Sequence, residues 1–129
     1  MIYSLFAIAL GATLGSWARW GLGLWLNASG GNLPLGTLVA NLIGGYAVGL
    51  AVAWFSAHPI FSPDLRLFVI TGLLGGLTTF STFSAETVQM LTRQQYGWAF
   101  VTIALHVIGS FAMTGLGLLT VRAMRSTPT

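Results

Sequence analysis

The ten residues from Thr78 to Thr87 have the most unusual chemistry in this sequence, because seven of them are polar within an otherwise apolar segment. Their hydroxyl groups surround two phenylalanines, Phe80 and Phe83, and a carboxylate, Glu86. Inside a bilayer, polar side chains persist only where protein or a water-filled cavity receives them. The run therefore predicts the lining of a pathway across a membrane.

Phe80 and Phe83 are neighbours at i and i+3, a spacing that also suits ordinary core or lipid-facing packing. The hydroxyl residues beside them argue against a plain lipid surface. A phenyl ring has a positive edge because of its quadrupole, so it can meet an anion without supplying a full charge. Conduction needs sites that admit an ion and also release it. The pair is thus a candidate anion contact.

The glycine pair Gly75-Gly76 precedes this run. Adjacent glycines weaken a helix because they lose much backbone entropy on folding, so we expect a helix break there. A broken helix frees carbonyl oxygens that can bind a cation such as Na⁺. The alternative is a kink closed by the hydroxyls of Thr78 and Thr79.

Few other polar residues lie deep in apolar segments, and several have two interpretations. Asn41 either makes an interhelical hydrogen bond or offers an N–H donor to a permeating anion. Arg19 either extends to the lipid headgroups or faces an aqueous vestibule that attracts anions. Glu86 either makes a structural hydrogen bond near a helix end or takes part in function.

A further polar stripe is formed by His106, Ser110 and Thr114, which share one helix face at i, i+4 spacing. A lone histidine is more often a packing residue than a ligand or proton carrier. Three polar groups in file on one face are harder to explain by packing alone, and they could form a hydrogen-bonding stripe along a pore.

The composition restricts the class of protein that positions these residues. Of 129 residues, 55% are hydrophobic and only 5% are charged, whereas soluble domains carry about 25% charged residues. The sequence therefore predicts a single-domain, all-α integral membrane protein. The net charge of +3 is too sparse for a nucleic-acid surface, and no cysteine is present to form a disulfide. No metal cluster or nucleophile–base set stands out, so we expect no enzyme.

Apolar segments long enough to cross a bilayer, which takes about 20 residues, are separated by glycine, proline and polar turns. We predict four transmembrane helices, the third broken within the membrane. Their approximate ranges are 2–26, 35–55, 65–91 and 98–121. Glycines at four-residue spacing in the first two, among them Gly11, Gly15, Gly45 and Gly49, favour close helix packing.

An even number of spans places both termini on one side of the membrane. The side with the termini would hold Arg66, Arg122 and Arg125, and the other side Arg19 and Arg93. This arginine bias is weak. Either other signals orient the chain, or it inserts both ways and pairs head-to-tail with a copy of itself.

Sequence blocks in all four segments resemble the Fluc (CrcB-type) family of fluoride channels. The most specific block is residues 75–84, Gly-Gly-Leu-Thr-Thr-Phe-Ser-Thr-Phe-Ser. Three weaker blocks, at 15–20, 36–41 and 106–110, support it. The resemblance covers essentially the whole chain.

The resemblance implies an antiparallel, dual-topology homodimer in a bacterial inner (plasma) membrane, with two pores for passive fluoride export that protects the cell. It implies that fluoride passes the pore residues Asn41, Phe80, Phe83, Ser81, Thr82, Ser110 and Thr114. It assigns vestibule or electrostatic roles to Arg19, Glu86 and His106. It also implies a structural Na⁺ at the dimer interface, held by main-chain carbonyls of Gly75 and Thr78.

Two other functions are compatible with parts of the sequence. A small proton-coupled multidrug antiporter would use Glu86 as its essential carboxylate, but it would leave the hydroxyl–phenylalanine run unexplained. A non-transporting subunit of a larger membrane complex would need a partner protein. A flux measurement on the chain alone distinguishes both from a channel.

Overall fold

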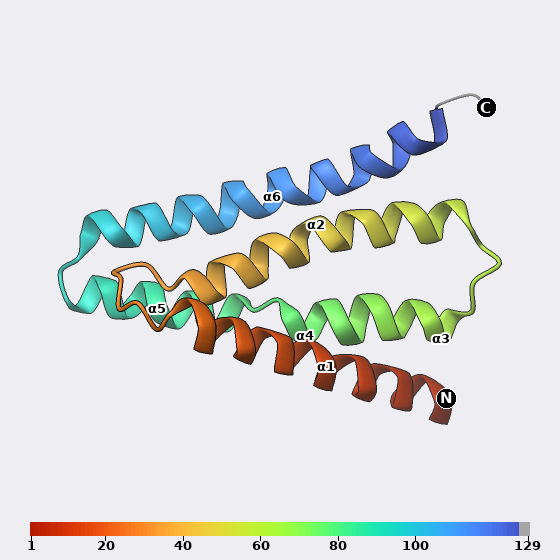
Figure 1. The fold of residues 1–129 in the computed structure, drawn as a ribbon, viewed down its shortest axis with the longest axis horizontal. Coiled ribbons are helices and arrows are strands. Elements are labelled where there is room, and N and C mark those ends of the chain that lie inside the picture. Colours follow the sequence, from red (N-terminus) through yellow and green to blue (C-terminus); the bar gives the residue numbers. More distant parts are fainter. Residues whose placement is uncertain (127–129) are drawn as a thin grey trace.

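The protein is built entirely from helices and turns in the computed structural model, which describes residues 1–126. Figure 1 shows α2 beside α6, α1 along the first half of a broken column, and both termini at one end. The elements are α1 (Ile2–Leu26), α2 (Leu35–Ala57), α3 (Pro63–Arg66), the π-helix η1 (Leu67–Leu74), α4 (Gly75–Leu77), α5 (Phe80–Thr92) and α6 (Tyr96–Ser126).

Asn27 connects α1 to α2 through both its backbone and its side chain. As the C-cap residue of α1, it donates its N–H to the carbonyl of Gly23 at 3.0 Å. Its Oδ1 accepts from the backbone N–H of Gly36 at 2.8 Å. Pro34, the residue before α2, makes no side-chain cap. Asn27 therefore satisfies one of the N–H groups that the start of a helix leaves without a partner.

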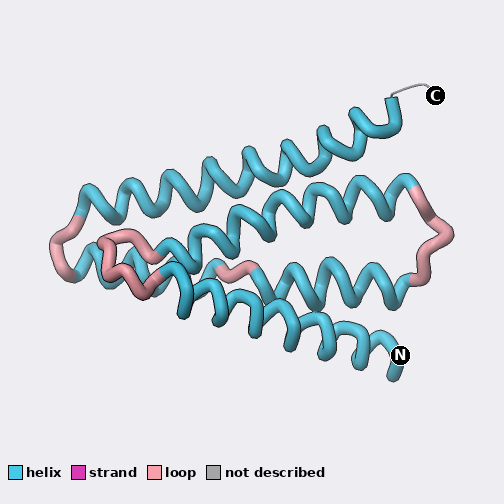
Figure 2. Tube along the Cα trace, in the orientation of Figure 1, coloured by secondary structure: helices cyan, strands magenta, loops and turns pink. Residues whose placement is uncertain are grey.

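The column from Pro63 to Thr92 is broken, but not where the sequence predicted. Gly75 is helical, with φ −65° and ψ −37°, so the break expected at Gly75-Gly76 was wrong in position. The backbone is extended at Thr78 (φ −85°, ψ 152°) and at Thr79 (φ −153°, ψ 114°). Figure 2 shows this loop between α4 and α5.

Close packing explains why the glycines stay helical. A Cβ on Gly76 would lie 2.5 Å from the carbonyl oxygen of Ala12, and one on Gly72 would lie 2.8 Å from that of Ile8. Gly11 faces the same contact from α1. These glycines let the backbones of α1 and the broken column approach each other, as small residues do between membrane helices.

The apolar surface identifies a multi-pass membrane protein. Within the described residues, three stretches are long and apolar enough to cross a membrane: Leu35–Ala57, Pro63–Thr92 and Tyr96–Ser126. α1 is 25 residues long but lies outside this set, since it contains Arg19. Large apolar side chains such as Phe6, Phe100 and Phe111 are at least two-thirds exposed. In water such a surface would favour aggregation, whereas lipid tails match it.

Candidate ion pathway at the helix break

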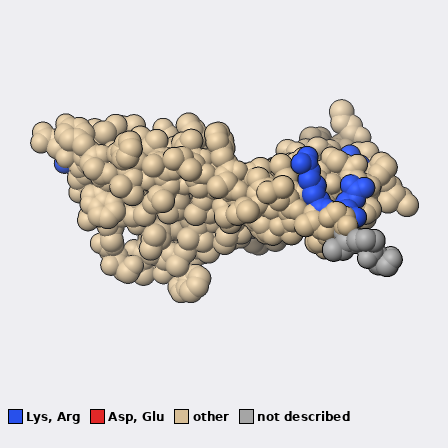
Figure 3. All heavy atoms as spheres, turned by 90° about the horizontal axis from the view of Figure 1, so that it is seen from above, with Lys and Arg blue, Asp and Glu red and all other residues tan. Residues whose placement is uncertain are grey.

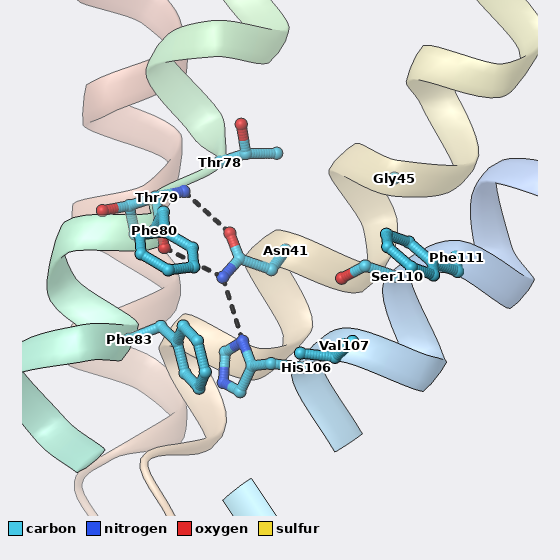
Figure 4. A pocket seen from close by; sticks show the side chains of 10 residues that line it. All are labelled: Asn41, Gly45, Thr78, Thr79, Phe80, Phe83, His106, Val107, Ser110 and Phe111. Carbon is cyan, nitrogen blue, oxygen red and sulfur yellow. Dashed lines mark hydrogen bonds between the residues drawn. The ribbon is translucent and has the colours of Figure 1, made fainter. Parts of the chain in front are cut away.

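Asn41 of α2 holds the break by pairing with both backbone polar groups of Thr79. Its Oδ1 accepts from the Thr79 N–H at 2.7 Å, and its Nδ2 donates to the Thr79 carbonyl at 3.0 Å. Figure 4 shows this pair at the centre of the site. Buried backbone groups without partners are costly, so one amide side chain stabilises the extended conformation at Thr79. The interhelical hydrogen bond considered for Asn41 is present.

The same amide fixes the proton position on His106 of α6. The Thr79 N–H can only donate, so Asn41 must present Oδ1 to it and Nδ2 to the other side. Nδ2 then donates to His106 Nδ1 at 3.0 Å. Because Nδ1 accepts, the ring is neutral with its proton on Nε2. Nε2 is buried and has no hydrogen-bond partner among the described residues.

Phe80 and Phe83 lie beside this amide in different environments. Their rings meet edge-to-face, with centroids 5.5 Å apart and planes at 73°. Phe83 is 7% exposed and stacks on His106 at 4.4 Å, whereas Phe80 is 77% exposed. Phe83 is thus part of the packed site, and Phe80 stands at its open edge.

The hydroxyls that follow the break are partly used in capping α5. Thr79 Oγ1 accepts from the Thr82 N–H at 3.1 Å, donates to Thr82 Oγ1 at 3.0 Å and lies 3.2 Å from Ser81 Oγ. Such a threonine N-cap satisfies a helix-start donor. The hydroxyls of Ser81 and Thr82 therefore gather around the cap at the start of α5.

A cavity of about 370 Å³ opens beside the break, and we call it the break cavity. Its lining, drawn in Figure 4, contains no charged side chain and consists of Asn41, Gly45, Thr78, Thr79, Phe80, Phe83, His106, Val107, Ser110 and Phe111. The Ser110 hydroxyl bonds no other described group. Thr114, expected on the same polar stripe, does not line the cavity, and its hydroxyl donates to the carbonyl of Gly45 at 3.0 Å.

A second cavity, also of about 370 Å³, lies between α1, α2 and α5, and we call it the arginine chamber. Arg19 and Glu86 both line it but form no ion pair with each other. Arg19 Nε donates to the carbonyl of Gly76 at 3.1 Å. Glu86 Oε1 accepts from Thr37 Oγ1 at 2.6 Å, and its Oε2 is buried without a partner. The guanidinium group of Arg19 and the carboxyl group of Glu86 therefore have separate hydrogen-bond partners.

Comparison with known proteins assigns the chain to a family. The family model described as "CrcB-like protein, Camphor Resistance (CrcB)" matches residues 6–118. The chain belongs to the CrcB-like family. Among similar proteins named "Fluoride-specific ion channel FluC", that of Pseudomonas putida is 59% identical over 93% of this chain and 94% of its own length. Those of Thiobacillus denitrificans and Nitrosomonas europaea are 54% and 57% identical over 95% of this chain and 98% and 96% of their own lengths.

In this CrcB-like chain the structure places most of the side chains singled out from the sequence in one of the two cavities, whereas Ser81 and Thr114 line neither. Asn41, Phe80, Phe83, His106 and Ser110 meet at the break cavity, whereas Arg19, Thr82 and Glu86 line the arginine chamber. Thr37 was missed. It precedes Asn41 by one helical turn on the same face, and this spacing is the signal that could have found it.

The carbonyl groups near the break have different partners in this CrcB-like chain. Arg19 donates to the carbonyl of Gly76. Thr78 donates to the carbonyl of Leu74 through both its N–H (3.0 Å) and its hydroxyl (2.9 Å). Neither Arg19 nor Asn41 donates to the carbonyls of Gly75 and Thr78. Gly75 is exposed on the surface of the chain. Among the described residues, no group of three or more His, Cys, Asp or Glu side chains could hold a metal ion.

Proposed function

We propose that this chain forms a fluoride-selective channel for passive fluoride export and is not an enzyme. The observation that carries the proposal is the break cavity, where Asn41, two phenylalanines, a neutral histidine and a free serine hydroxyl meet without any charged side chain. The names of the relatives, fluoride-specific ion channels, support the choice of ion.

The chemistry of the break cavity suits a small, strongly hydrated anion. A selective pore has to replace the water around fluoride with donors at close range. Both N–H groups of Asn41 are occupied by Thr79 and His106. The available donors are therefore the Ser110 hydroxyl and positive ring edges, because Nε2 of His106 is buried. No lysine or arginine lines the cavity to trap the ion.

We further propose that the working unit is an antiparallel homodimer with two pores in a bacterial inner membrane, in which α1 is the fourth span of each chain. Phe80 stands 77% exposed at the edge of the break cavity, so a second copy would complete the site. The arginines are nearly balanced between the two predicted sides of the membrane, three against two. This near-balance favours insertion in both orientations.

A sodium ion at the dimer interface is the cofactor we propose. The carbonyls of Gly75 and Thr78 fit it chemically, because Na⁺ binds main-chain oxygens freed by a helix break. Two oxygens from one chain are too few for a complete site, and the exposed position of Gly75 allows a second chain to supply two more. The ion would then connect the two subunits at their breaks.

The test is fluoride efflux from liposomes that contain only the purified chain. We expect rapid passive fluoride flux and essentially no chloride flux. Phe80→Ile and Phe83→Ile should each cut the fluoride flux strongly, whereas Phe100→Ile, a 73% exposed ring outside both cavities, should leave it unchanged. Proton-coupled drug transport without fluoride flux would instead establish an antiporter. No flux from a folded dimer would overturn the channel.

A further inference from the structure

A groove is formed by residues of α2 and α6. Figure 1 shows these two helices diverging at the end of the molecule that carries both termini. The volume of the groove is about 260 Å³. Val52 and Ala53 of α2 and Leu118 and Val121 of α6 form apolar walls, and Arg122 and Arg125 lie at its α6 side. Arginine side chains gather at this end on the face shown in Figure 3, where no acidic side chain is visible.

Neither Arg122 nor Arg125 has a carboxylate partner among residues 1–126. The sequence has only two acidic side chains. Asp64 accepts from the Ser4 hydroxyl at 2.7 Å, and Glu86 accepts from the hydroxyl of Thr37. Both are thus engaged elsewhere. Two guanidinium groups three residues apart therefore lie next to an apolar groove without a carboxylate partner among residues 1–126.

A second apolar cavity lies on the other side of the contact between α2 and α6, separated from the groove by Val121. Val121 is 3% exposed and also lines a neighbouring cavity of about 410 Å³, together with Leu50, Trp54 and Phe55. The walls of this second cavity are almost entirely apolar. The groove itself offers the accessible side chains of Val52 and Leu118 beside the two arginines, so a molecule that fills it would need a hydrocarbon chain and an anionic head.

We propose that this groove binds one anionic phospholipid, with its phosphate between Arg122 and Arg125 and an acyl chain along Val52 and Leu118. Arginine matches phosphate oxygens in a bidentate manner, and basic pockets between membrane helices bind anionic headgroups. A free phosphate would leave the apolar walls uncovered. The site involves neither the break cavity nor the arginine chamber, and its occupancy does not depend on which ion the chain conducts.

Native mass spectrometry of the purified full chain in detergent tests the site, with phosphatidylglycerol and phosphatidylcholine of identical chains added in competition. We expect bound phosphatidylglycerol to predominate. The double variant Arg122→Gln/Arg125→Gln should lower that preference about thirtyfold, because each arginine near an anionic headgroup is worth about a fivefold factor in binding. Arg122→Lys/Arg125→Lys, which keeps both charges, should retain most of it.

Arg93→Gln is the matched control, since Arg93 is an exposed arginine in the turn between α5 and α6, at the end of the molecule opposite to both termini. It should keep the preference. Ser56→Trp, which fills the groove from α2, should reduce bound phosphatidylglycerol while both arginines remain. The proposal is overturned if Arg122→Gln/Arg125→Gln, with an elution profile like that of the original chain, keeps its preference. It is equally overturned if Arg93→Gln loses as much, or if inorganic phosphate displaces the lipid.

Discussion

The break cavity and the arginine chamber are of similar volume and are lined by residues on either side of the helix break between α4 and α5. They differ in whether charged side chains line them. The break cavity is lined only by neutral groups, whereas the arginine chamber contains Arg19 and Glu86. Asn41 stabilises the helix break from the break cavity through Thr79, and Arg19 from the arginine chamber through the carbonyl of Gly76. The break is therefore held between an uncharged site and a charged one.

This difference suggests a division of labour along the proposed pathway. A full positive charge attracts anions over a distance and raises the rate at which they arrive. The same charge at a narrow site would bind the anion too tightly for rapid release. Placing Arg19 in the outer chamber and leaving the break cavity neutral would serve both requirements.

A charge placed in the break cavity should have the largest effect on this division. In Asn41→Asp the carboxylate can still accept from the Thr79 N–H, but it cannot donate to the Thr79 carbonyl or to His106 Nδ1. We expect the free energy of unfolding to fall by about 2–5 kcal/mol, because two acceptors then face a carboxylate. Fluoride efflux should fall by about a hundredfold or more, since a negative charge repels the permeating anion.

Asn27→Asp is the control for stability. The Asn27 side chain acts as an acceptor toward the Gly36 N–H, and a carboxylate can keep that role. Its unfolding in detergent should match that of the original chain within about 0.5 kcal/mol. Undiminished fluoride efflux through Asn41→Asp would show that a charge is tolerated at the break. It would contradict the claim that the break cavity has to be neutral.

Removing the charge of the arginine chamber should have a smaller effect that depends on salt. We expect Arg19→Gln to lower fluoride efflux about three- to tenfold at low ionic strength, and less at high ionic strength, because salt screens attraction over more than about 10 Å. Arg19→Lys keeps the charge but loses the Nε bond to Gly76. Arg19→Lys should therefore keep the salt dependence of fluoride efflux. Any loss of efflux in this variant would report on the missing hydrogen bond at the helix break.

Arg93→Gln is the matched control for this measurement, because Arg93 is exposed and lines neither the arginine chamber nor the break cavity. Efflux measured across a series of salt concentrations should be unchanged in it. An Arg19→Gln defect of constant size at all salt concentrations would argue against electrostatic attraction and for a purely structural role of Arg19 at Gly76.

The helical elements could be expected from the sequence because their signals are local. Proline, glycine and polar turns separate apolar stretches, and α1 begins and ends at the residues expected, Ile2 and Leu26. The position of the break could not be read this way. A glycine pair is compatible both with a flexible backbone and with close packing, and only the contact of Gly76 with Ala12 decides between them.

The pairing at the candidate site depends on contacts between residues distant in sequence. Asn41 and Thr79 are 38 residues apart, and Thr37 and Glu86 are 49 apart. Residue type identified Asn41 and Glu86 as unusual, but it did not say which groups they bond. Nor does any local pattern predict the π-helical geometry of Leu67–Leu74, which arises where the column packs against α1.

The polar stripe on α6 gives the smallest predicted effect and the sharpest test of how far the break cavity extends. The sequence placed Ser110 and Thr114 on one pore-lining face, but only Ser110 lines the cavity, while Thr114 donates to Gly45. Thr114→Val should cost about 1 kcal/mol of stability and change fluoride efflux less than twofold. Ser110→Ala should do the reverse, lowering efflux severalfold without loss of stability, because its hydroxyl has no other partner. Efflux reduced as much by Thr114→Val as by Ser110→Ala, with both proteins folded, would return Thr114 to the pathway and extend it one helical turn along α6.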